Sequence, residues 1–190
     1  MDTERNTQFL EILKERLTEQ RLYHSICVAE KAKHLAEIFG GDPEKAYTAG
    51  LVHDIMRYEP TEKMIELIES DGQCLTESEK NITVTLHAIA GKVYLRKKLN
   101  VTDEEILSAV RWHTTGKENM TLLEKIIYVA DLTSDDREYP DVEEVRMMAE
   151  ESLEKTCIRG LSFTIEDNAR KHRPIHLDTV KAFNYLAERI

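Results

Sequence analysis

Residues 23–57 read YHSICVAEKAKHLAEIFGGDPEKAYTAGLVHDIMR, and this stretch decides the fold. Its first part carries one stripe of residues at helical spacing, formed by His24, Val28, Ala32, Leu35 and Phe39. Gly40 and Gly41 then end this helix, and Asp42-Pro43 gives the next one an N-cap and a proline at its first position. The stretch therefore predicts two consecutive helices, the second of which carries His53 and Asp54 near its end.

Imidazole and carboxylate side chains lie on the inward faces of five predicted helices. They are His24, His53, Asp54, His87, His113 and Asp131. Taken one at a time, each is more often a hydrogen-bonded core histidine or a helix-end aspartate than a metal ligand. Burying them separately costs several kcal/mol each unless a partner satisfies each group. The joint pattern therefore favours a shared metal centre, and imidazole with carboxylate suits iron, manganese, zinc, cobalt or nickel.

Helix signals continue along the whole chain, and no convincing period-two strand pattern interrupts them. Only seven glycines and four prolines leave little room for the turns of an all-β fold. We therefore expect an all-α bundle of about ten helices, folded as a single domain over residues 1–190. The predicted helices are 3–18, 21–39, 43–57, 61–70, 77–98, 103–113, 121–133, 142–150, 152–171 and 178–189. Capping-box spacing supports several of their starts, at Thr76–Glu79, Thr102–Glu105, Thr121–Glu124 and Asp141–Glu144.

Composition narrows the class of partner. The chain of 190 residues is 41% hydrophobic and 33% charged, which fits a soluble globular protein, and its net charge is −10. That charge argues against nucleic acid or an anionic membrane as a partner. Cys27, Cys74 and Cys157 are odd in number and form no CxxC pair, which indicates a reducing, cytoplasmic compartment. We expect neither a signal peptide nor a membrane span.

The adjacent pair His53-Asp54 constrains the metal centre. On a helix the two side chains point about 100° apart, so both reach one metal only if the helix packs edge-on to it. With His24 and Asp131 from two other helices, the centre has four protein ligands. Open positions then remain for water and substrate, as in a catalytic rather than a structural site.

His87 and His113 have several possible roles. They can bind a second metal bridged by Asp54, hydrogen-bond a phosphate oxygen, or protonate a leaving group. The sequence leaves these alternatives open, and with them the number of ions, one or two.

The order H…HD…H…H…D resembles that of the HD-domain phosphohydrolases, and more narrowly the bacterial YqeK-type HD hydrolases. Besides residues 23–57, the matching stretches are LHAIAGKVY (86–94), RWHTTGKENMTLLEKIIYVAD (111–131) and IHLDTVKAFNYL (175–186). The HD dipeptide alone is weak evidence, but the ordered set covers nearly the whole chain and is specific.

The resemblance implies an iron-type centre and symmetric hydrolysis of diadenosine tetraphosphate to two ADP. It places metal ligation on His24, His53, Asp54 and Asp131, and catalysis on Asp54, His87 and His113. The expected nucleotide contacts are His24, Asp54, Arg57, His87, His113, Thr114, Asp131, Arg137, Arg173 and His176. A homodimer is expected from the resemblance only.

Two positions depart from the family pattern. Arg57 stands where many HD proteins have lysine; it can pair a phosphate as a fork, or be an exposed cation at a helix end. Phe183 stands where an arginine is expected, which puts a nucleotide contact there in doubt. The basic cluster 170–173 fits either a helix C-terminus or a lip over the substrate phosphates, and the second is slightly favoured.

Several other functions compete with this one. Within the superfamily they are a 5′-nucleotidase, a nucleoside triphosphate hydrolase or a guanosine tetraphosphate hydrolase. The cyclic-dinucleotide type is disfavoured because HDIMRYEP (53–60) lacks the HDxGYP pattern. A non-catalytic nucleotide sensor or a helical interaction module is a different class, and the complete ligand set argues against both. His34 shares its stripe with charged residues and is expected to be solvated.

Overall fold

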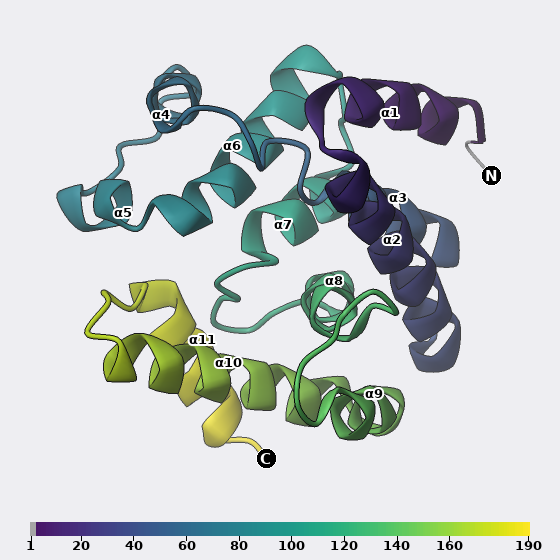
Figure 1. The fold of residues 1–190 in the computed structure, drawn as a ribbon, viewed down its shortest axis with the longest axis vertical. Helices are drawn as coiled ribbons and strands as arrows, with labels where there is room; N and C mark the ends of the chain where they lie inside the picture. The colour runs from purple at the N-terminus through teal and green to yellow at the C-terminus, as the bar shows by residue number, and fades with distance from the viewer. Residues whose placement is uncertain (1–2) are drawn as a thin grey trace.

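The computed structural model describes residues 3–190, and helices are the only regular elements within that range (Figure 1). The all-α prediction is confirmed. The helices are α1 (Thr3–Arg16), α2 (Glu19–Phe39), α3 (Pro43–Val52), α4 (Thr61–Glu69), α5 (Glu77–Asn81), α6 (Thr83–Lys98), α7 (Glu104–Trp112), α8 (Leu122–Thr133), α9 (Val142–Glu151), α10 (Leu153–Arg170) and α11 (Leu177–Ala187). No helix among these residues is long and apolar enough to cross a bilayer.

The second helix of the opening stretch ends earlier than predicted. α3 stops at Val52, and His53-Asp54 lies in the turn that follows rather than within a helix. The His53 ring nitrogen Nδ1 lies 2.6 Å from the Gly50 carbonyl oxygen. A continuing helix would offer that carbonyl to the Asp54 N–H, so the imidazole competes for it. The chain then turns through the bonds Ile55 N–H to Val52 O and Arg57 N–H to Asp54 O.

The prediction of one helix over residues 77–98 is also wrong. The chain breaks at Ile82, whose φ of −93° and ψ of 61° are not helical, and separates α5 from α6. Thr85 donates to the Ile82 carbonyl with both its N–H (3.0 Å) and its hydroxyl (2.9 Å), which starts the new helix there. The structure therefore has eleven helices over the described residues, rather than about ten.

Two of the four predicted capping boxes form in the structure, and two do not. Those at Thr76–Glu79 and Thr121–Glu124 are confirmed by reciprocal hydrogen bonds. The box at Thr102 is wrong, because the next residue, Asp103, caps α7 by accepting from two backbone N–H groups. Asp141 is the N-cap residue of α9, as predicted, but it has φ 67° and its side chain makes no cap bond, so the box does not form.

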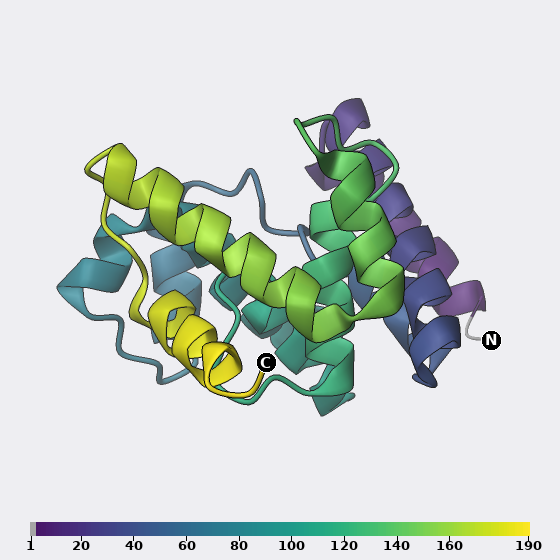
Figure 2. The ribbon, with the colours of Figure 1, turned by 90° about the horizontal axis from the view of Figure 1, so that it is seen from below.

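Two close helix contacts bring the functional elements together. A Cβ on Gly50 would lie 2.9 Å from the Ala29 Cα, so α3 packs backbone to backbone on α2. A Cβ on Gly160 would lie 2.9 Å from Leu132 Cδ2, so α10 also packs closely on α8. α10 and α11 lie side by side, and together with α9 they form the lower side of the molecule in the view of Figure 1; Figure 2 shows α10 and α11 from below.

Candidate metal centre and substrate cavity

His24 reaches the centre from α2 and meets a carboxylate at each ring nitrogen. Nδ1 lies 2.8 Å from Asp136 Oδ2, and Nε2 lies 3.0 Å from Asp131 Oδ1. If Nδ1 donates its proton to Asp136, the Nε2 lone pair faces the oxygen of Asp131. Two acceptors in that arrangement need a cation or a proton between them.

His53 has a buried ring nitrogen, Nε2, that no hydrogen bond satisfies. Its Nδ1–H donates to the Gly50 carbonyl, so its Nε2 is an acceptor. That atom is buried and makes no hydrogen bond. It lies 3.5 Å from Asp54 Oδ2 and 4.0 Å from Asp131 Oδ1. A cation between these atoms would satisfy all three at once, so the residues present fit a bound metal ion.

Two groups of three residues could each hold a metal ion, and are called metal-competent groups here. Within each group the ligand atoms lie within 4.8 Å of one another. One group is His24, His53 and Asp131, and the other is His53, Asp54 and His113. Together they contain all four ligands predicted from the sequence, and they add His113.

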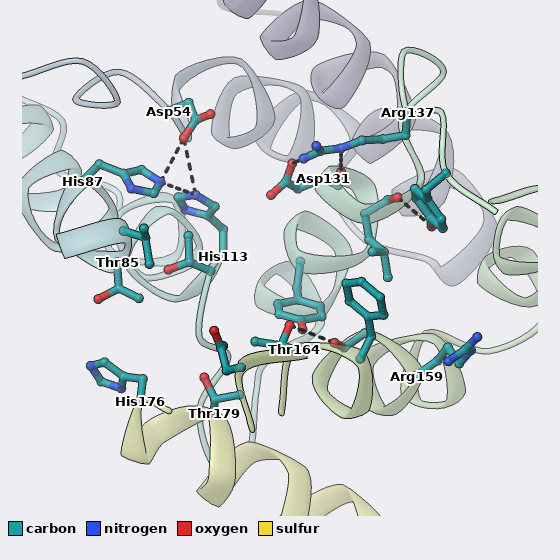
Figure 3. Close-up of a pocket in the computed structure, with 18 of the residues that line it drawn as sticks. Asp54, Thr85, His87, His113, Asp131, Arg137, Arg159, Thr164, His176 and Thr179 are labelled. Atoms are coloured by element: carbon teal, nitrogen blue, oxygen red, sulfur yellow. Dashed lines mark hydrogen bonds and ion pairs between the residues drawn. The ribbon is translucent and has the colours of Figure 1, made fainter. Parts of the chain in front are cut away.

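His87 and His113 meet at Asp54 on the other side of the centre (Figure 3). Their Nε2 atoms lie 3.1 Å apart, and that of His87 lies 3.0 Å from Asp54 Oδ1. His113 Nδ1 donates to the Val110 carbonyl at 2.7 Å, which leaves its Nε2 an acceptor. Arg57 Nη1 lies 3.2 Å from His87 Nδ1, so that nitrogen accepts and His87 Nε2 carries the proton.

The electrostatics of the centre keep both aspartates ionised. Burial would raise the pKa of Asp54, but the histidines around it, His53 first, hold the pKa well below its ordinary value. Burial would also raise the pKa of Asp131, but the contact with His24 and the charge of Arg137 outweigh it, and the pKa is again well lowered. Burial lowers the pKa of His87 to about 4, so this imidazole is neutral near pH 7.

Two arginines border the aspartates on the substrate side. Arg21 Nη1 lies 3.0 Å from Asp54 Oδ2. Arg137 donates from Nε to the Asp131 carbonyl at 2.7 Å and from Nη2 to its carboxylate. Both guanidinium groups are partly exposed, so they can also bind substrate phosphates.

A cavity of about 640 Å³ opens beside the centre. It is lined by most of the predicted nucleotide contacts, namely Asp54, Arg57, His87, His113, Thr114, Asp131, Arg137 and His176. His24 lines a smaller cavity of about 480 Å³ on the other side of Arg21 and Arg137. Either space is large enough for part of a nucleotide.

Two buried side-chain atoms that line the large cavity have no hydrogen-bond partner. Thr114 Oγ1 and His176 Nε2 are buried and make no hydrogen bond. His176 caps α11 through Nδ1, which accepts from the Asp178 N–H at 3.2 Å and fixes the ring. Buried polar atoms of this kind are usually satisfied by something, so a ligand with matching polar groups fits here.

One predicted nucleotide contact lies outside both cavities. Arg173 does not line the cavity, and its Nη2 binds Asp167 Oδ2 at 2.6 Å. Arg170 and Lys171 bind the same carboxylate, so the basic cluster is partly neutralised. Phe183 packs against the hydrophobic core. A substrate role for Arg173 therefore stays a prediction.

Sequence reasoning missed two residues of the site, Arg21 and Asp136. Arg21 lies three residues before His24, a spacing that puts both on one side of a helix, and this signal was available. Asp136 sits in an acidic turn after α8, where nothing in the sequence indicates that it contacts a histidine on α2.

The match to the HD-domain family covers residues 21–136, which include every candidate metal ligand. This chain belongs to the HD-domain family. Its HD relatives include two proteins named symmetrical bis(5′-nucleosyl)-tetraphosphatase. The one from Halalkalibacterium halodurans is 38% identical, over 93% of this chain and 94% of the relative. The one from Bacillus subtilis is 37% identical, over 93% of this chain and 95% of the relative.

A solved HD structure confirms the fold. It is a predicted HD superfamily hydrolase involved in NAD metabolism from Clostridium acetobutylicum. It superposes with a TM-score of 0.95 at 38% identity and covers 97% of each chain. The HD architecture thus extends over α10 and α11, which lie outside the matched range of the family.

Proposed function

We propose that this chain hydrolyses diadenosine tetraphosphate symmetrically to two ADP, using a metal held by its histidines and aspartates. The names of the full-length relatives support the substrate and the position of the cut. The observation that carries the metal is the buried Nε2 of His53, which faces two carboxylates without a hydrogen bond.

His24, His53, Asp54 and Asp131 would hold the metal. We propose iron, which suits mixed imidazole and carboxylate ligands, as do manganese, cobalt, nickel and zinc. When bound, such a metal supplies Lewis acidity, which neutralises charge on a phosphoryl oxygen and makes water a nucleophile near neutral pH. The two metal-competent groups share His53, so the centre would hold one ion or two. His113 would bind the second ion or contact a phosphate oxygen.

The residues around the centre orient and neutralise the phosphate chain. Arg21 and Arg137 bring positive charge to the carboxylates and can contact phosphoryl oxygens on the cavity side. His87 presents an Nε2–H toward Asp54, because Arg57 occupies its Nδ1. If the Asp54 carboxylate were bound to a metal, this N–H could donate to a phosphate oxygen instead and stabilise its charge. A departing nucleoside diphosphate is weakly basic, so it needs little protonation.

The test is a panel of nucleotides incubated with the metal-loaded protein. Diadenosine tetraphosphate should give two ADP per molecule. In water enriched in heavy oxygen, one label should appear on the terminal phosphate of one of the two ADP molecules. ATP plus AMP as first products would contradict the symmetric cut.

The same panel separates the alternatives. Release of inorganic phosphate from nucleoside monophosphates alone would favour a 5′-nucleotidase. Attack on nucleoside triphosphates alone would favour a triphosphate hydrolase. Tight binding without turnover would favour a sensor. NAD belongs in the panel because the solved relative is described as involved in NAD metabolism.

We also propose a cytoplasmic protein that acts on small nucleotides, with no nucleic-acid or membrane partner, in keeping with a net charge of −10. A single domain over residues 1–190 and a homodimer remain parts of this proposal. Light scattering after size-exclusion chromatography tests the dimer, and a single cooperative unfolding transition is the result expected for one domain.

A further inference from the structure

The large cavity extends along one face of α10. Arg159, Gly160, Phe163, Thr164 and Asn168 all line it, and at about 100° per residue they cover roughly half of the helix circumference. With a rise of 1.5 Å per residue, Arg159 and Asn168 lie about 13 Å apart along the helix. The cavity is therefore elongated, and Arg159 and His176 lie toward opposite sides of it (Figure 3).

The two ends differ in chemistry. The end near α11 is polar and contains Thr85, Thr114, His176 and Thr179. The other end, called here the Phe163 lobe, is mostly apolar apart from Arg159 and Asp141; it is lined by Leu132, Tyr139, Pro140, Asp141, Val145, Arg159 and Phe163. A flat apolar base fits the Phe163 lobe better than a phosphate chain does.

Phe163 and Arg159 carry the case for a ligand there. Phe163 is 57% exposed, although it is a large aromatic side chain, and it forms part of the wall of a cavity. Arg159 lies one turn earlier on the same face, and within the described residues it makes no hydrogen bond or ion pair. The other arginines at the cavity, Arg21, Arg57 and Arg137, each contact a residue of the metal centre.

We propose that the Phe163 lobe is a second nucleoside subsite, which takes one adenosine of the dinucleotide while the polar end of the cavity holds the other. Phe163 stacks on the base, and Arg159 pairs with the phosphate next to that adenosine. This inference rests on the proposed function. A cut at the centre of four phosphates leaves two on each side, so a substrate held at both ends places its middle bond at the metal.

The smaller cavity fits the second adenosine less well. Besides Arg21 and Arg137, its lining includes the carboxylates of Asp136 and Glu138. These would repel the phosphates that join the base to the metal centre. The Phe163 lobe also belongs to the same cavity as Asp54 and Asp131, so a substrate can pass from one to the other without a break.

The test compares a two-ended with a one-ended substrate. Diadenosine tetraphosphate needs both subsites, whereas adenosine 5′-tetraphosphate has a single adenosine and can use the polar end alone. Phe163→Ala and Arg159→Gln should each lower kcat/KM for the two-ended substrate by about tenfold to hundredfold. Phe163→Ala should leave hydrolysis of adenosine tetraphosphate to ADP and pyrophosphate within about twofold of wild type. Arg159→Gln should lower it as well, because this substrate keeps the phosphate that Arg159 contacts. Phe163→Trp should restore the lost activity because it keeps an aromatic face.

Met147→Ala is the matched control, because Met147 is an exposed apolar side chain on α9 outside both cavities. Equal losses on both substrates for Phe163→Ala, or no loss on either, would overturn the subsite. A loss for Tyr58→Ala in place of Phe163→Ala would move the second adenosine to the smaller cavity and also overturn it. Wild-type protein that turns over adenosine tetraphosphate but not diadenosine tetraphosphate would instead overturn the proposed function.

Discussion

Three imidazoles at the metal centre, those of His24, His53 and His113, are each oriented by an acceptor behind the ring. Asp136 holds Nδ1 of His24, the Gly50 carbonyl holds that of His53, and the Val110 carbonyl that of His113. Each contact fixes the ring and directs Nε2 toward the aspartates. Two of the three acceptors are backbone groups three residues earlier, so the local fold orients these rings by itself.

Of these three acceptors only Asp136 is a side chain, so only it can be removed by substitution. Asp136→Ala should weaken metal binding by roughly 10–100-fold, since His24 loses the partner that fixes its tautomer. Metal titration of the chelator-stripped protein measures the effect. Asp135→Ala is the control, because the neighbouring Asp135 is exposed and does not touch a metal ligand. Equal affinity for both variants would show that Asp136 does not orient His24.

His87 provides a test of donor against ligand. His87→Ala should keep the metal but cut turnover by about 10²–10⁴-fold, because a positioned donor is lost. Metal analysis and single-turnover rates on one preparation measure both quantities. Loss of the metal together with activity would instead make His87 a ligand.

The sequence predicts the residue types at the centre well, because a helical stripe reports which side chains face inward. It cannot predict which atoms meet. Asp136 contacts His24 across 112 positions of the chain, and Arg57 contacts His87 across 30, so these pairs depend on tertiary packing. The protonated nitrogen of His87 follows only from that second contact.

At the scale of elements, the contact between α2 and α3 positions the HD pair. Gly50 lies against the backbone of Ala29 and Val28, three residues before His53. The close approach is possible only without a side chain at position 50. The end of α3 is determined by the same residue, whose carbonyl accepts from the His53 ring.

Gly50→Ala should therefore destabilise the protein by about 1–3 kcal/mol, because the new methyl group meets backbone atoms that cannot turn aside. Activity should fall with it, since α3 ends at Val52, directly before His53. Gly91→Ala is the comparison, because its Cβ would meet a side-chain methyl, Val110 Cγ1, at 3.2 Å, which can adjust. Thermal and urea unfolding compare the two variants, and equal stability would contradict the close-packing argument.

Helix existence follows from apolar periodicity, but several helix ends do not. The break at Ile82 depends on Thr85 bonding back to its carbonyl, and Asp103 replaces Thr102 as a cap because of its position in the folded turn. Such choices between neighbouring hydrogen-bonding groups differ by little energy, so the local sequence alone does not decide them.

At the scale of the whole molecule, the substrate cavity has two walls from distant parts of the chain. The metal ligands lie within residues 21–136, whereas α10 and α11 supply the opposite wall. The sequence indicates helices in both parts but not how they face each other. The sequence shows the basic cluster 170–173 but not its partner, which is Asp167 for Arg170, Lys171 and Arg173. A lip over the substrate phosphates stays a prediction.

The central claim is that the buried histidine and aspartate acceptors bind one metal centre. The most direct test is the metal content per chain of protein purified without chelator. Wild type should hold a transition metal, and His53→Ala should lose both the metal and diadenosine tetraphosphate hydrolysis while keeping its helical circular dichroism. His34→Ala should match wild type, because His34 is exposed and pairs with Glu150 on the surface. Full metal content in His53→Ala, or a metal-free native protein equally active in strong chelator, would contradict the assignment.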